Sequence, residues 1–320
     1  MIRLVKIKHL FLFFLSAWLW FFIPVSLSGQ CLQPDNPDFP SVSKNGILFQ
    51  CCDSASCQIV LLSSKTDSVF RYRTYSKRPQ HPVWVPGKAA FVFDSGSGIN
   101  SRLYYYNLRT KRQRGLIPYK MACREASFTP SRHLAIFSGY DDRSGYWQIF
   151  SYDFVYGNVN RLTSEQGNCL FPVFSPNGKQ ITYLVQSENG KQYLKCMNWY
   201  GEANDTLSEN VYGKACWTPD SYRILYVSQQ GDHFVLMSVT GDNSGKKEIY
   251  SSSVPIKSPA LSADGKMLYL IKKDNGQFRL VHVPFVFSAT GNFSIVVNSN
   301  EHADQAKHKG YPQKYWSGSK

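Results

Sequence analysis

The residues that could do chemistry in this 320-residue sequence lie far apart in the chain. The most suggestive are His81, Arg124, Glu125, Lys214 and Lys257. Cations of this kind favour an anionic group, and an imidazole beside a carboxylate can transfer protons. Paired carboxylates or an acidic metal cluster, which glycoside or phosphate hydrolysis requires, do not gather anywhere in the sequence.

Three further motifs point only weakly to a site. The run Asp94–Gly98 lacks the Gly-x-Ser-x-Gly spacing of a nucleophile elbow and lies between strand-like segments. Asp141 and Asp142 sit in a polar hairpin that indicates a turn. His302 and His308 are six residues apart in a basic tail. We therefore predict no catalytic residue, no metal site and no cofactor.

The candidate residues named above lie within a sequence repeat, and the fold of that repeat must position them. A small residue before a turn recurs six times, with 42 to 46 residues between copies, at Ser43, Val85, Thr129, Ser175, Thr218 and Ser262. An apolar residue stands one position before each anchor, and Pro or Ala stands three before. The turn after each anchor is rich in Pro, Asn, Asp and Gly, which is typical of a hairpin between two strands.

Each repeat reads as four strands. In the fourth repeat we expect strands at about 180–186, 192–199 and 204–209, after an inner strand that ends at Ser175. Third strands elsewhere are rich in aromatic and β-branched residues; they are expected at 58–62, 102–106, 147–152, 233–237 and 277–281. Six such units predict an all-β, six-bladed β-propeller of four-stranded antiparallel blades. Its blades would span about 38–78, 79–119, 120–165, 166–210, 211–253 and 254–299.

The register of the repeat predicts a site at the mouth of the channel, where the chain enters each innermost strand. Four residues before the anchors stand Phe39, His81, Glu125, Phe171, Lys214 and Ser258; five before stand Asp38, Gln80, Arg124, Leu170, Gly213 and Lys257. The candidate ligand-binding residues are Gln80, His81, Arg124, Glu125, Lys214 and Lys257. The alternative is that these charges pair with one another or are solvated loop charges.

The two ends of the chain differ from the repeats. Residues 1–29 combine a basic start, an apolar run and small residues, which predicts a cleaved secretory signal peptide, followed by a lead-in over 30–37. The alternatives are an uncleaved membrane anchor and lipid attachment at Cys31. No other stretch is apolar enough to cross a membrane. Residues 300–320 form a basic tail that we predict to be flexible, although its aromatic residues could dock on a blade edge.

Charge and cysteines indicate an exported protein. The net charge is +14, and signal cleavage would remove three of the 36 basic residues. The positive charge that remains favours acidic or polyanionic partners. Cysteines of an exported chain favour disulfides, and Cys52 and Cys57 flank a hairpin loop that a cross-strand bond could close. Cys31 could then pair with Cys51, whereas a zinc site would need nearby histidines. The other four cysteines cannot be paired from the sequence.

The sequence of the repeat resembles that of TolB-like β-propellers. The segments 161–163 and 172–183, and a second copy at 258–269, match the family's Arg-Leu-Thr strand end and its Pro-x-Phe/Trp-Ser-Pro-Asp-Gly-Lys turn. The resemblance implies export to the periplasm or cell surface of a Gram-negative-type bacterium and binding of proteins or other ligands at the channel mouth. TolB carries an α/β domain before its propeller, whereas this chain is predicted to be a propeller alone.

We therefore expect an exported, non-enzymatic propeller that binds a protein or an anionic envelope ligand. Nucleic acid is disfavoured because the chain carries an export signal. One alternative is a lyase or hydrolase acting on an anionic carbohydrate in a basic channel mouth. Another is a structural subunit of an envelope complex. The oligomeric state and the ligand do not follow from the sequence.

Overall fold

The computed structural model describes residues 36–287 and 293–295, except 54–55, 67, 73 and 203–204. These residues form six antiparallel sheets of four strands each. Within them the structure contains no α-helix, only the 3-10 turn η1 (Gly98–Asn100). Consistent with this, no helix of the described residues is long and apolar enough to cross a membrane. The predicted all-β, six-bladed propeller is confirmed.

The strands follow one another in chain order within each sheet. Blade one contains β1 (Asn36–Ser43), β2 (Gly46–Cys52), β3 (Cys57–Ser63) and β4 (Val69–Tyr72). Blade two contains β5 (Gln80–Trp84), β6 (Ala90–Ser95), β7 (Arg102–Asn107) and β8 (Arg112–Gly115). Blade three contains β9 (Cys123–Phe128), β10 (Leu134–Asp141), β11 (Tyr146–Asp153) and β12 (Val159–Arg161).

The second half of the ring repeats this order. Blade four contains β13 (Asn168–Phe174), β14 (Gln180–Gln186), β15 (Gln192–Asn198) and β16 (Asp205–Glu209). Blade five contains β17 (Cys216–Trp217), β18 (Arg223–Gln230), β19 (His233–Thr240) and β20 (Lys247–Ser252). Blade six contains β21 (Ile256–Leu261), β22 (Met267–Asp274), β23 (Gln277–Phe287) and β24 (Phe293–Ile295). The predicted third strands lie within β3, β7, β11, β19 and β23.

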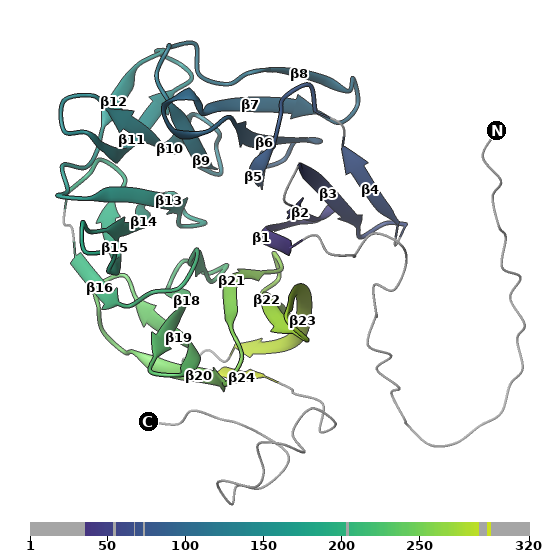
Figure 1. The fold of residues 1–320 in the computed structure, drawn as a ribbon, viewed down its shortest axis with the longest axis vertical. Coiled ribbons are helices and arrows are strands. Elements are labelled where there is room, and N and C mark those ends of the chain that lie inside the picture. The colour runs from purple at the N-terminus through teal and green to yellow at the C-terminus, as the bar shows by residue number, and fades with distance from the viewer. Residues whose placement is uncertain are drawn as a thin grey trace, which may run out of the picture. The chain divides into compact units, whose positions relative to one another are not determined.

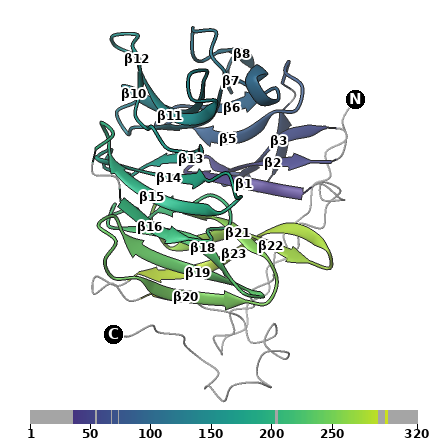
Figure 2. The ribbon, with the colours of Figure 1, turned by 60° about the vertical axis from the view of Figure 1, so that its left-hand side comes forward.

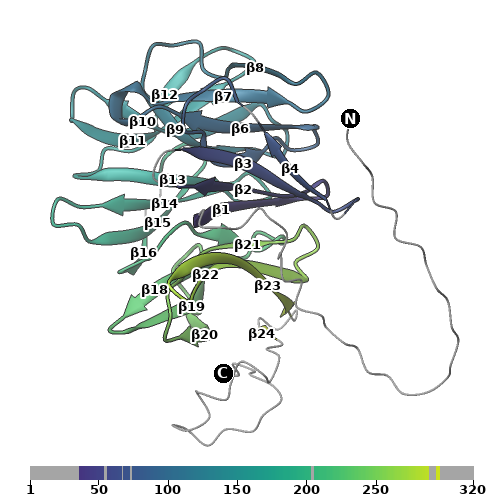
Figure 3. The same cartoon turned by 45° about the vertical axis from the view of Figure 1, so that its right-hand side comes forward.

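The blades surround a common centre. The first strand of each sheet lies innermost and the fourth lies at the periphery (Figure 1). No strand crosses from one sheet to another, so the ring closes where β1 contacts β21 and β22 (Figures 1 and 3). Closure therefore depends on side-chain contacts between the first and last blades.

Apolar side chains hold neighbouring blades together. One core cluster joins Leu184 and Leu194 of blade four to Trp217 and Tyr226 of blade five, all at most 5% exposed. Figure 2 shows the corresponding sheets, β13–β16 and β18–β20, as adjacent layers. Each blade alone would expose both apolar faces of its sheet, and stacking in a ring buries them, which is the main driving force for this fold.

The turn chemistry seen in the sequence is used as expected. Gly46, between β1 and β2, has a φ of +126°, and a Cβ added there would lie 2.0 Å from the carbonyl oxygen of Leu62. Only glycine fits such a position. The turn thereby sets the register in which Ser43 lies opposite Gly46.

Candidate functional site

A bulge in the inner strands places one residue per blade at the centre. The pairing between the first and second strands shifts register beside the position four residues before the anchor in five blades. That position has a positive φ, between 48° and 59°, at Phe39, His81, Glu125, Phe171 and Ser258. Side chains other than glycine rarely adopt this conformation, so its recurrence shows that the surrounding contacts enforce it.

Blade five departs from this pattern. Its positive φ, 85°, falls on Gly213, and its inner strand β17 is only two residues long. A Cβ on Gly213 would lie 3.1 Å from the Cβ of Lys257, so the glycine permits close approach of blade six. Lys214 follows it and reaches the centre from the same side.

These residues line one central cavity. Its walls are formed by Phe39, His81, Glu125, Phe171 and Lys214, together with adjacent Pro and Ala residues. The ring of Phe39 lies 4.4 Å from that of His81 and 5.0 Å from that of Phe171, measured between centroids. The remaining space holds about one water molecule. Thus three of the six predicted site residues, His81, Glu125 and Lys214, meet at one place.

His81 is held by a carboxylate from the second strand of its own blade. Its Nδ1 lies 2.8 Å from Oδ1 of Asp94, which is 2% exposed, and its backbone N–H donates to Oε1 of Gln50 at 2.8 Å. Burial lowers the pKa of His81, but the Asp94 carboxylate and, more weakly, Glu125 outweigh burial, so the pKa is raised. The pair therefore favours a protonated imidazole.

Glu125 is fully engaged by its neighbours. Its Oε2 accepts hydrogen bonds from Ser138 Oγ at 2.8 Å and from the backbone N–H of Phe171 at 2.7 Å. Its own N–H donates to Asp94 Oδ1 at 3.0 Å. Arg124 Nε lies 3.4 Å from its other oxygen. These contacts join blades two, three and four by a chain of buried polar groups.

The partners of this chain lie on the second strands and were not predicted. Gln50, Asp94 and Ser138 each stand opposite the residue five before the anchor. In the last three blades the equivalent positions are apolar: Leu184, Val227 and Ile271. A polar residue in the middle of an otherwise apolar strand, as in Phe93-Asp94-Ser95, was the available signal.

Lys214 differs from the other cations of the site. Among the described residues its ammonium group makes no hydrogen bond or ion pair. Burial lowers its pKa, while the charges of Cys216 and Glu125 act in the opposite direction with smaller effect. Lys214 is therefore the cation of this cavity that is most able to receive an anionic group.

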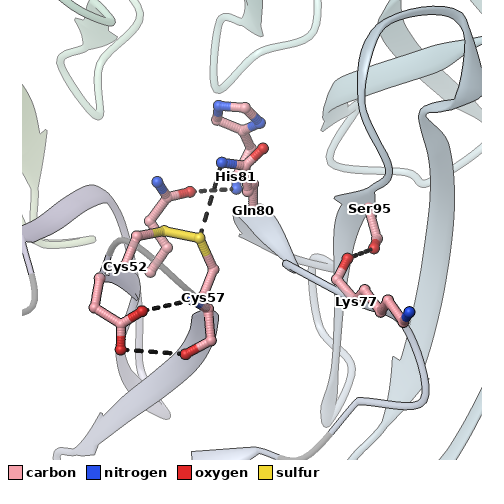
Figure 4. The surroundings of a disulfide bond; sticks show 9 residues. Cys52, Cys57, Lys77, Gln80, His81 and Ser95 are labelled. Atoms are coloured by element: carbon pink, nitrogen blue, oxygen red, sulfur yellow. Dashed lines mark hydrogen bonds between the residues drawn. A yellow bond between two sulfur atoms is a disulfide. The ribbon is translucent and has the colours of Figure 1, made fainter.

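The other predicted residues lie beside the cavity and are partnered. The guanidinium of Arg124 lies 4.1 Å from the ring centroid of Trp147. Gln80 Nε2 lies 4.0 Å from Cys57 Sγ, a weak contact. These positions leave Arg124 half-exposed and direct Gln80 toward blade one (Figure 4).

Lys257 takes part in closing the ring. Its ammonium group pairs with Oδ2 of Asp38, and Ser258 Oγ donates to Oδ1 of the same carboxylate at 2.8 Å. Asp38 also accepts the N–H of Phe39 at 2.8 Å. Since no strand crosses this seam, Asp38 is the main polar link between blades one and six.

One of the two suggested disulfides is present. Cys52 and Cys57 lie opposite each other at the ends of β2 and β3, with Cα atoms 4.1 Å apart, and their sulfur atoms are bonded (Figure 4). Cys51 is buried, and Cys31 lies outside the described residues, so their pairing stays a prediction. Burial raises the thiol pKa to about 11 for Cys123 and about 12 for Cys169, Cys196 and Cys216. These four thiols are therefore poor nucleophiles.

The weaker motifs have structural roles. Asp94 belongs to the polar chain, Ser95 Oγ donates to the carbonyl of Lys77, and Asp141 Oδ2 accepts from Arg161 at 2.6 Å. Within the described part of the chain, no three His, Cys, Asp or Glu side chains lie close enough together to hold a metal ion. His302 and His308 lie outside it, as do residues 1–29, predicted to be a signal peptide, and residues 300–320.

Comparison with known proteins identifies the family. A model described as the TolB beta propeller domain matches residues 37–264, so the chain belongs to that family. A comparison with curated proteins gives no match.

Solved structures share the fold at low sequence identity. TolB from Acinetobacter baumannii aligns with a TM-score of 0.57 and 17% identity over 77% of this chain and 56% of that one. A putative TolB from Agrobacterium tumefaciens gives 0.58 and 15% over 79% and 91%. An oligogalacturonate lyase in complex with manganese gives 0.57 and 13% over 83% of this chain and 78% of that one. These likenesses concern the fold.

Proposed function

We propose that this chain is an exported, non-enzymatic propeller that binds a partner protein at its central channel. An acidic group of the partner would approach Lys214, with Arg124 at the rim. Membership of the TolB propeller family and the predicted signal peptide support an envelope location. A nidogen/laminin complex also aligns with this chain, at a TM-score of 0.54 and 9% identity, which is consistent with protein binding by this fold.

The engagement of the central carboxylates carries this proposal. Glu125 and Asp94 each accept hydrogen bonds that link blades, and Asp38 closes the ring. The oxygens of these carboxylates are occupied by neighbouring groups of the protein, whereas general acid catalysis needs a carboxyl group within hydrogen-bond reach of the substrate. The cavity has room for about one water and none for a sugar ring. A partner can therefore reach only the entrance of the channel.

Charge reversal tests the proposal. The protein and its Lys214→Glu variant would be used to capture partners from the native envelope fraction. Lys214→Glu is expected to lose the partner, while Lys272→Glu, on the last strands, serves as a matched charge control and keeps it. Equal capture by both variants would remove the channel as the binding site.

A second candidate is an enzyme acting on an anionic carbohydrate. The observation that favours it is the meeting of His81, Glu125 and Lys214 at one cavity, because imidazole, carboxyl and amine side chains are the groups that enzymes use for general acid–base catalysis. The test is incubation with oligogalacturonate and analysis of the products. Cleavage that disappears in Lys214→Met would favour the enzyme over the binding protein.

A further inference from the structure

A second hollow lies away from the centre, between blades four and five. It has a volume of about 460 Å³, is open to solvent, and is bounded by the β14–β15 turn, the β18–β19 turn and the segment that links the two blades. Its lining includes Asn189, Lys191, Gln192, Asn210, Tyr212 and Gln229. We call it the amide groove, because four of these six side chains are carboxamides.

One carboxamide of the amide groove is used by the protein, because Asn189 Oδ1 accepts from Ser187 Oγ at 2.6 Å and from the Lys191 N–H at 3.1 Å. The other polar groups are little used. Among the described residues, the Lys191 ammonium, the Gln192 and Asn210 amides and the Tyr212 hydroxyl make no hydrogen bond. Gln229 Nε2 makes only a long contact, 3.5 Å, to the carbonyl of Gly231. This differs from the central cavity, where the carboxylates accept hydrogen bonds from neighbouring blades.

The backbone of the groove floor is already paired. The N–H of Tyr212 donates to the carbonyl of Val227 at 2.8 Å, and the N–H of Gln229 donates to that of Asn210 at 2.9 Å. The N–H of Val211 donates to Gln192 at 3.3 Å. An extended peptide that adds to a sheet needs unpaired backbone groups. Recognition in this groove must therefore use side chains.

The chemistry of those side chains selects a class of ligand. A carboxamide offers donors and an acceptor together, which matches hydroxyl groups, since each hydroxyl also donates and accepts. Purely anionic ligands need donors only, and cations need acceptors only. The ring of Tyr212, packed 5.1 Å from Phe234, adds a supported apolar surface. The volume is within the range of small-ligand sites.

We propose that the amide groove binds a hydroxyl-rich oligosaccharide, with Gln192, Asn210 and Gln229 bonded to its hydroxyls and Tyr212 against a sugar face. Lys191 at the rim accommodates one acidic sugar. This site is separate from the central channel and does not depend on the function proposed for it.

Titration calorimetry with three probes tests the groove. The probes are cellotetraose, the N-acetylglucosamine tetramer and tetragalacturonate, added to the wild-type protein. Binding of at least one probe is expected, with about tenfold weaker affinity in Gln229→Ala and in Gln192→Ala, since each removes about one hydrogen bond. Gln230→Ala, the adjacent exposed residue outside the groove, is the matched control and should change affinity less than about twofold.

Three outcomes overturn the proposal. The first is that none of the probes binds. The second is that a probe binds the groove variants and the wild type with equal affinity. The third is that peptides selected by display bind the groove and lose affinity in Gln229→Ala, which would make it a peptide site. Unchanged thermal unfolding of the variants shows that any loss of affinity is local.

Discussion

The first three blades and the last three solve the same packing problem in different ways. In blades one to three, the middle of the second strand carries Gln50, Asp94 or Ser138. Asp94 and Gln50 accept backbone N–H groups of the next blade, and Ser138 supports Glu125, which does the same. In blades four to six the same position is Leu, Val or Ile and is at most 1% exposed.

The difference separates polar groups that stabilise the fold from polar groups that are available to a ligand. Polar groups of the first half satisfy the backbone of the bulges and hold the centre rigid, so they are unavailable to a ligand. The second half is held by apolar packing and leaves its polar side chains on the outside, as in the amide groove. Substitutions in the two halves should therefore differ in kind, and the following predictions test this.

The largest effect is expected for Glu125→Ala. The change leaves the Phe171 N–H and Ser138 Oγ without their acceptor and removes the negative partner of Arg124. Breaking a buried network of this kind costs about 3 kcal/mol of unfolding free energy. Urea unfolding measures it. A loss below about 1 kcal/mol would show that the polar chain does not hold the first half together.

Asp38→Ala should follow, with a loss of about 2 kcal/mol, because the seam between blades one and six loses its contacts from Asp38 to Lys257 and Ser258, and the N–H of Phe39 loses its acceptor. Limited proteolysis would report opening of the ring near β1. The control is Asp274→Ala, whose carboxylate forms an exposed pair with Arg279 and should matter little.

A smaller, pH-dependent effect is expected at His81. Its pKa is raised in the folded state, so the stabilisation is fully present below pH about 6.5, the ordinary histidine value, and is lost as the pH rises through the folded pKa. Unfolding free energies at several pH values would show this fall in the wild type. His81→Asn, which tolerates the positive φ, should flatten it; a parallel profile in the variant would exclude this residue as the cause.

Lys214→Met should stabilise the protein by about 1 kcal/mol, because it removes a half-buried cation that has no hydrogen-bonded partner among the described residues. Partner capture should be lost in the same variant. Thermal unfolding and capture measured together would show whether stability and binding oppose each other here. A destabilised Lys214→Met variant would instead make this lysine part of the structure.

The smallest effect on stability is expected for Gln229→Ala in the amide groove, less than about 0.5 kcal/mol, because the side chain is exposed and weakly bonded. Urea unfolding beside Glu125→Ala gives the direct comparison. A loss similar to that of Glu125→Ala would remove the distinction between the two halves.

Much of the architecture was predictable because it depends on local chemistry. The turn after each anchor and the alternation of apolar residues specified the strands, and the constant period specified the number of blades. The same register predicts that His81, Glu125 and Lys214 lie at the centre, where all three line one cavity. The Cys52–Cys57 bond followed from two cysteines flanking a hairpin loop.

The partners of those residues were less accessible. The sequence predicted Asp94 to lie in a loop between strands and gave no role to Ser138, because their roles depend on contacts with the next blade's Glu125 N–H and with the Glu125 carboxylate. The amide groove combines three segments between residues 189 and 231, and none of them carries a motif. Contacts of this kind depend on how the ring closes, and this is not encoded in any short stretch of sequence.

The sequence by itself determined the class of fold, the repeat register and the positions that face the centre, because hydrophobic periodicity and turn residues act over a few neighbours. Only the tertiary structure decided which charged side chains pair with one another and which stay available to a ligand. Asp38 is 219 residues from Lys257, yet ring closure brings them together. Pairing across such separations follows from the packing of whole blades, and it leaves Lys214 and the amide groove as the groups open to a ligand.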